Sequence, residues 1–163
     1  MKTIALALLS VCALRADDAV AWQFNGRVSK PSGVVRDLGA DATGGGLGFA
    51  LVAGREPLRL RVRMDRDAYP GSNGTVTASG LGAEAILVMP TADAWQAFVS
   101  LGPAFEQWQL GTSPARTTNK AALRAEVGFL YKDHVGFCVG ALTGPTLDGR
   151  RATCTYLGIS FTR

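Results

Sequence analysis

Residues 58–65 read LRLRVRMD, and up to Met64 this stretch alternates an apolar residue with an arginine. Side chains of an extended strand point to opposite faces with a period of two, so the alternation predicts a strand with two unlike faces. The apolar face carries Leu58, Leu60, Val62 and Met64, and the charged face carries Arg59, Arg61, Arg63 and Asp65. Such a strand needs an apolar environment on one side of its sheet and a polar one on the other.

The same period of two recurs along the rest of the chain. It predicts further strands over 20–29, 45–53, 75–89, 94–107, 120–132, 134–141 and 154–162. Most of these stretches approach the ~9–11 residues that a tilted strand needs to cross a bilayer. We therefore expect an all-β protein, an eight-stranded antiparallel up-and-down transmembrane β-barrel.

The expected connections differ in length in a regular way. The odd connections, 30–44, 68–74, 107–119 and 144–151, are the longer ones, whereas the even connections at 54–57, 90–93 and 132–134 are tight. Membrane barrels show this pattern, with loops outside the cell and short turns in the periplasm.

The face opposite the apolar one favours a membrane barrel over a soluble sandwich. It is rich in Gly, Ala, Ser and isolated charges, and small residues suit the crowded interior of an eight-stranded barrel. Charges of both signs on this face are expected to pair inside a narrow, plugged lumen, because unpaired charges there would be costly. The candidate lumen-lining charges are Arg27, Arg59, Arg61, Arg63, Asp65, Glu84, Arg124 and Glu126. Glu84 is the first expected partner for the arginines.

Two other functions fit the alternation. The arginines could line a narrow pore for small solutes, anions included. A soluble exported β-barrel could instead bind a small ligand in its interior.

Aromatic residues mark the strand ends of the apolar face. Trp22, Trp95, Tyr131 and Phe161 all fall at the end that carries the chain termini. Membrane barrels place a girdle of aromatic residues at the bilayer interface, so we expect these four to form one.

The first residues, MKTIALALLSVCALRA, resemble a secretory signal peptide with a positive start, a short apolar run and a small residue at the cut. We expect residues 1–16 to be this leader and 17–163 to be a single barrel domain, exported to the bacterial outer membrane. Removing Lys2 and Arg15 leaves 15 of the 17 basic residues against 13 acidic ones. So small an excess argues against a nucleic-acid partner.

The mature chain would keep two cysteines, Cys138 and Cys154, in the inward phase of neighbouring strands. They would lie opposite each other if the residue numbers of paired positions sum to 292, and an exported pair invites a disulfide. The alternative is two buried thiols.

The sequence predicts neither an enzyme nor a cofactor. His134 is the single histidine, no serine lies in a GxSxG turn, and one histidine with two cysteines makes no metal-ligand set. The glycines of GGGLGFA, residues 44–50, open a strand and not a helix, which excludes a dinucleotide-binding loop.

The leader, the eight amphipathic stretches, FVSLGPAF at 98–105 and the closing TYLGISFTR together resemble the small outer-membrane β-barrels of the OmpA, OmpX, OmpW and opacity-protein type. The resemblance covers nearly all of the mature chain. It implies a monomer in contact with outer-membrane lipid, with a surface partner bound through the extracellular loops. Arg163 departs from the pattern, because these families usually end in an aromatic residue.

Overall fold

The computed structural model describes residues 20–37, 43–71, 74–92, 94–110, 116–147 and 150–163. The expected leader, residues 1–16, lies outside these ranges. Within them, no helix has the length and apolar character required to cross a membrane.

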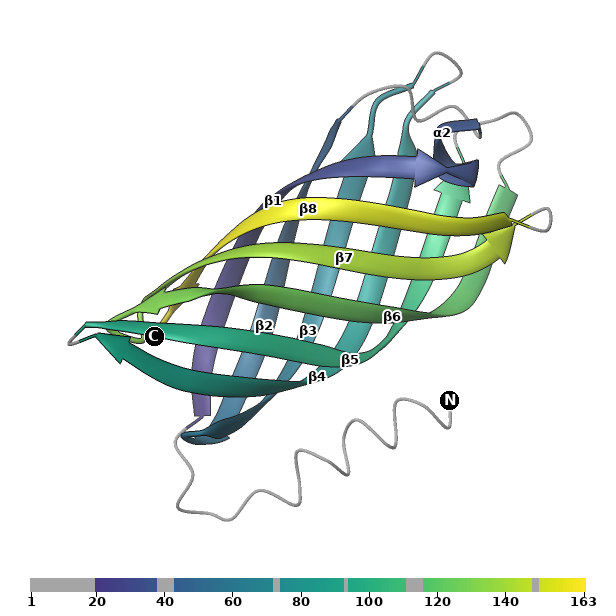
Figure 1. Ribbon diagram of the computed structural model, residues 1–163. Coiled ribbons are helices and arrows are strands. Elements are labelled where there is room, and N and C mark those ends of the chain that lie inside the picture. The colour runs from purple at the N-terminus through teal and green to yellow at the C-terminus, as the bar shows by residue number, and fades with distance from the viewer. Residues whose placement is uncertain (1–19, 38–42, 72–73, 93, 111–115, 148–149) are drawn as a thin grey trace.

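Eight strands wind into one closed barrel (Figure 1). Their bounds are β1 Val20–Gly33, β2 Gly44–Arg55, β3 Leu58–Tyr69, β4 Val76–Ala92, β5 Trp95–Leu110, β6 Arg116–Tyr131, β7 Val135–Leu147 and β8 Arg150–Thr162. A single helical turn, α2 (Val34–Asp37), follows β1. Each strand pairs antiparallel with the next, and β1 pairs with β8, with Phe24 opposite Phe161. The predicted eight-stranded antiparallel barrel is therefore confirmed.

The two ends of the barrel differ. The loop end carries α2 and the connections after β1, β3, β5 and β7, and the turn end carries the other connections together with Val20 and Arg163 (Figure 1). Several strands extend further toward the loop end than expected. β5 reaches Leu110, β6 begins at Arg116, and only residues 148–149 separate β7 from β8. The expected loops 107–119 and 144–151 are thus shorter than predicted.

The outer surface of the barrel is apolar over most of its height. Leu47 is 77% exposed, Leu157 64% and Phe24 60%. On β5 the outward apolar positions run from Trp95 to Phe105. Ten residue steps at the usual rise, tilted by about 40°, give a belt about 25 Å tall, the height of the apolar band of a membrane barrel. Polar residues such as Gln107 and Gln109 occupy the outward positions beyond it.

Candidate functional site: the filled interior of the barrel

The interior of the barrel is packed with charged side chains. Four arginines and five carboxylates of the described residues point inward and are almost fully buried. They are Arg27, Arg61, Arg63, Arg124, Asp65, Asp67, Glu84, Glu106 and Glu126. We call this set the charge network. Its members come from β1, β3, β4, β5 and β6, so it links strands across the barrel as well as around it.

Arg61 lies at the centre of the charge network. Its Nε donates to Glu84 Oε2 at 3.0 Å, and its Nη2 donates to both Glu84 and Glu126. The same nitrogen donates to Ser100 Oγ at 3.2 Å. Glu84, the expected partner from the neighbouring strand, therefore pairs with Arg61, as β3–β4 register also requires.

Arg63 and Arg124 extend these contacts toward the loop end. Arg63 donates from Nη1 to Glu126 Oε1 at 2.6 Å and from Nε to Asp65 Oδ2 at 3.0 Å. Arg124 donates from Nη1 to Asp65 Oδ2 at 2.6 Å and from Nη2 to Glu106 Oε1 at 3.1 Å. Charge-assisted hydrogen bonds of this kind can offset the cost of removing ions from water.

Arg27 connects the first strand to the same network. Its Nε donates to Asp67 Oδ1 at 2.7 Å, its Nη2 also pairs with Asp67, and its Nη1 lies 3.3 Å from Asp65 Oδ2. The guanidinium carbon lies 5.2 Å from the ring centroid of Tyr156, within the range of a cation–π contact. The Tyr156 hydroxyl donates to Glu126 Oε1 at 2.7 Å.

Inward glycines provide the space that these side chains occupy. Gly46 and Gly48 of β2 lie opposite Asp67 and Asp65 of β3. A Cβ atom at either glycine would overlap the facing carboxylate. The glycine-rich stretch 44–48 therefore lets the acids of β3 lie flat against the barrel wall and reach the arginines.

An apolar layer fills the interior between the charge network and the turn end. Its members are buried inward residues of β2, β4, β5 and β6: Val52, Ile86, Val88, Phe98 and Leu130. Along β4 the order is Glu84, Ile86 and Val88, so the apolar side chains follow directly after the charge network. We call this set the turn-side layer.

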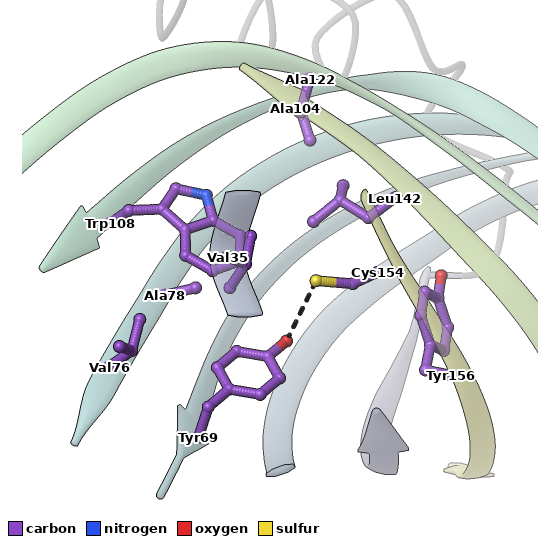
Figure 2. Packing of buried hydrophobic residues seen from close by; sticks show 10 residues of the cluster. All are labelled: Val35, Tyr69, Val76, Ala78, Ala104, Trp108, Ala122, Leu142, Cys154 and Tyr156. Carbon is purple, nitrogen blue, oxygen red and sulfur yellow. Dashed lines mark hydrogen bonds between the residues drawn. The ribbon is translucent and has the colours of Figure 1, made fainter. Parts of the chain in front are cut away.

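A second apolar layer fills the interior toward the loop end (Figure 2). Tyr69 and Trp108 stack there with ring centroids 5.9 Å apart, and Val35 of α2 is fully buried beside them. The Tyr69 hydroxyl contacts Cys154 Sγ at 3.6 Å. This loop-side layer comprises Val35, Tyr69, Val76, Ala78, Ala104, Trp108, Ala122, Leu142, Cys154 and Tyr156. The connection after β1 thus contributes a side chain that helps to fill the barrel mouth.

Arg59, one of the expected lumen-lining charges, lies apart from the charge network at the rim of the turn end. Its Nη2 donates to Glu56 Oε1 at 3.0 Å and to Asp133 Oδ1 at 2.9 Å. Glu56 belongs to the turn before β3 and Asp133 to the turn before β7, so Arg59 bridges two separate turns of this rim. The other seven expected charges, Arg27, Arg61, Arg63, Asp65, Glu84, Arg124 and Glu126, lie in the charge network.

The expected disulfide between Cys138 and Cys154 is wrong, because both thiols are free. Cys138 lies opposite Gly158, and Cys154 lies opposite Leu142, so paired numbers sum to 296 and not to 292. Four positions of β8 therefore separate Cys154 from the residue facing Cys138. The alternative of two buried thiols agrees better with the structure, although Cys138 is only partly buried.

The four residues of the expected aromatic girdle are exposed on the outer surface near the turn end. Trp95 pairs with Tyr131 in the β5–β6 register, with ring centroids 5.0 Å apart. Tyr131 lies opposite Val135, which in turn lies opposite Phe161. Trp22 lies beside the chain end, where its backbone N–H donates to the Arg163 carbonyl at 2.9 Å.

The charged side chains of the described interior contact one another and the neighbouring wall residues. Among the residues that the structure describes, no group of three His, Cys, Asp or Glu side chains could hold a metal ion. His134 lies exposed in the turn before β7, with Nδ1 3.2 Å from the Thr162 carbonyl oxygen. Each charged side chain described above contacts other side chains of the wall, which is the arrangement of a filled core.

The sequence did not predict the two apolar layers. Asp67 and Glu106 fall in the inward phase of their strands, although the candidate lumen-lining charges did not include them. One signal was present, because Ile86 and Val88 interrupt the small, polar phase of β4. Trp108 carried no such signal, since its stretch was expected to be a loop. Tyr156, whose hydroxyl joins the charge network, lies in the inward phase of β8. The sequence pattern does not indicate that Glu126 would be its partner.

No protein-family model matches this chain. No curated protein matches its sequence. Solved structures do resemble it. Neisserial surface protein A (NspA) superposes with a TM-score of 0.66 at 16% identity, over 88% of this chain and 97% of NspA.

The chain has the fold of the small outer-membrane β-barrels. The N-terminal β-barrel domain of Pseudomonas aeruginosa OprF gives a TM-score of 0.57 at 12% identity, over 88% of this chain and 97% of that domain. Ail, the attachment invasion locus protein of Yersinia pestis, gives 0.51 at 8% identity, over 90% and 97%. At these identities the likeness concerns the fold of such barrels alone.

Proposed function

We propose that this protein is an exported, monomeric outer-membrane barrel with a closed interior, which acts as a structural or surface-contact protein of the cell envelope. The observation that carries the proposal is the inverted polarity of the chain. Apolar side chains such as Leu47 and Leu157 are exposed, whereas charged ones such as Arg124 are fully buried. Lipid stabilises an apolar exterior of this extent, and water does not.

The two apolar layers support a closed interior. They lie on either side of the charge network, so a hydrated ion that entered from one end would meet a layer of packed aliphatic and aromatic side chains. Apolar constrictions of this kind block conduction because they do not stay wet. The arginines are also neutralised by neighbouring carboxylates, which leaves no ladder of free positive charge for an anion.

The loop end supports surface contact. It carries the longer connections after β1, β3 and β5, and α2 displays the exposed Arg36 there while burying Val35. A barrel with its termini in the periplasm would present this end to the outside. Its partner would then bind residues of these connections, and the barrel would serve as the rigid support.

Membrane fractionation tests the proposed location. We expect the mature protein in the outer-membrane fraction, and we expect the folded form to migrate differently from the boiled form on a gel. A soluble periplasmic protein without heat-modifiable migration would contradict the proposal and favour the ligand-binding barrel.

Conductance across planar bilayers tests the closed interior. We expect no steady current from the folded protein, with an open porin in the same bilayers as the positive control. A large, steady anion current would contradict a closed interior and favour the narrow pore.

A further inference from the structure

The outer surface of the barrel carries two neighbouring grooves near the loop end. One has a volume of about 730 Å³ and runs over β8, β1, β2 and β3. The other, of about 640 Å³, runs over β2, β3, β4 and β5. Leu47 and Arg66 line both, so the two grooves lie on either side of one shared pair of side chains. Their walls are otherwise mainly apolar, for example Leu157 and Ile159 in the first and Met64 and Phe105 in the second.

Small outward residues create the first groove. Gly26 lies in the outward phase of β1 between Phe24 and Val28, and Gly45 lies in the outward phase of β2 before Leu47. Neither position is so crowded that only glycine fits there. A Cβ atom at Gly26 would lie 3.7 Å from the nearest atom of Ile159, and one at Gly45 would lie 3.8 Å from the Arg27 carbonyl oxygen. Both are ordinary contact distances, so the groove is an open space that larger side chains could fill.

Arg66 places a positive charge at the edge of both grooves. It follows Met64 on the outward face of β3, where the apolar belt ends, and its cross-strand neighbours are Leu47 and Ser79. Among the described residues, its exposed guanidinium has no ion-pair partner, in contrast to Arg61 and Arg63 on the opposite face of the same strand. An unpaired arginine here is tolerable only close to the lipid headgroups, because the free-energy cost of a lipid-facing arginine falls steeply from the bilayer midplane to the interface.

We propose that this surface binds an anionic phospholipid of the leaflet at the loop end, whose phosphate is not neutralised by a cationic headgroup. Arg66 binds the phosphate, since a planar guanidinium matches phosphate oxygens with two parallel hydrogen bonds. Two acyl chains of the same lipid lie in the two grooves, on either side of Leu47. The inference rests on the proposed membrane location, and it adds a specific lipid site to a surface that would otherwise be covered by any lipid.

Native mass spectrometry of the folded barrel tests this site with two probes that share their acyl chains, dipalmitoyl phosphatidic acid and dipalmitoyl phosphatidylcholine. We expect the protein to retain the phosphatidic acid in preference. Arg66→Gln should reduce this preference about fivefold, the effect of one cation near a lipid surface. Gly26→Leu should lower retention of both lipids, because it fills a groove and leaves Arg66 in place. Gly45→Leu repeats the groove test if Gly26→Leu fails to fold.

Arg36→Gln is the matched control, because Arg36 is exposed at the same end but does not line either groove. Equal retention of the two lipids by a properly folded, heat-modifiable barrel would overturn this inference and leave the membrane location intact. An equal loss of preference in Arg36→Gln and Arg66→Gln would also overturn it, because the effect would then be general charge. Failure of the protein to enter membranes at all would instead contradict the proposed function.

Discussion

Arg124 shows how single residues hold the interior together. It is fully buried and contacts Asp65, Glu84 and Glu106 through both terminal nitrogens. A buried ion pair adds little compared with a well-packed apolar pair, but removing one partner leaves a charge with no compensation. The cost of a substitution at Arg124 therefore comes mainly from the carboxylates that it leaves behind.

Replacement of Arg124 by glutamine should destabilise the folded barrel by about 3–5 kcal/mol, since Glu106 loses the arginine it contacts. Urea unfolding in lipid vesicles, followed by tryptophan fluorescence, measures the change. Glu106→Gln in the same chain should restore part of the loss, which a double-mutant cycle would show as a coupling energy. Additive effects of the two substitutions would argue that the pair does not interact.

The cysteines lead to a second prediction at this scale. Cys154 is 2% exposed and packs under Tyr69, and Cys138 lies against both apolar layers. Without reductant, the folded mature protein, which lacks Cys12 of the expected leader, should react slowly with a thiol reagent, and the unfolded mature protein should take up two equivalents within the same time. Mass spectrometry counts the additions. An unfolded, unreduced chain with no reactive thiol would restore the disulfide.

Strand β2 shows how an element can serve two environments. Its inward phase begins with glycines that face the acids of β3, and its outward phase carries Leu47, Phe49 and Leu51. Gly45 and Gly46 are adjacent but lie in opposite phases. Only the inward one is crowded by a carboxylate, that of Asp67.

This contrast predicts opposite outcomes for two neighbouring alanine substitutions. Gly46→Ala should cost about 1–3 kcal/mol, the usual effect of overpacking, because Asp67 must move away from Arg27. Gly45→Ala should leave stability nearly unchanged, since its methyl group points outward at an ordinary contact distance. Parallel urea titrations give the unfolding free energy of each variant. Equal values would show that the interior can relax around the added methyl group.

The strands could largely be predicted from the sequence, whereas their ends and the register between them could not. Period-two alternation identified all eight strands, because lipid-facing and inward residues differ strongly in character within the apolar belt. Beyond the belt the polarity of the two faces reverses, because Gln107 and Gln109 point outward while Trp108 is buried. A search for apolar outward residues therefore ends the fifth strand at Gln107 and predicts a loop after it. The predicted β7–β8 register is wrong because its turn lies too early in the sequence, although the dipeptide Asp148-Gly149 is typical of a two-residue hairpin turn.

Ion-pair partners depend on distances across the barrel, which alternation along one strand does not contain. The charged phase therefore indicated which arginines point inward but not which acids each would meet across the lumen. Arg59 shared the phase of Arg61 and yet lies at the rim, because phase does not report depth.

The whole molecule is a barrel whose polarity is reversed relative to a soluble protein. Depth in the bilayer should therefore decide the effect of an outward charge. Leu101 lies near the middle of the apolar belt on β5, whereas Gln107 lies just beyond its loop-end edge.

Leu101→Arg should reduce the unfolding free energy in lipid vesicles by about 2–4 kcal/mol, and Gln107→Arg by about 0–1, because the cost falls with distance from the midplane. Both free energies come from reversible unfolding in the same vesicles. A soluble barrel would show no such difference, since an arginine at the exposed position of Leu101 would then have little effect.

The contact between Arg27 and Tyr156 has a consequence for how the molecule is assembled. These residues belong to β1 and β8, the first and last strands, so their contact spans the seam where the sheet meets itself. In an open sheet, Arg27 would lack Tyr156, and much of the charge network would remain hydrated. Pairing of β1 with β8 and removal of water from the charge network therefore occur together. The contacts of Arg27 across the seam therefore favour cooperative closure of the barrel.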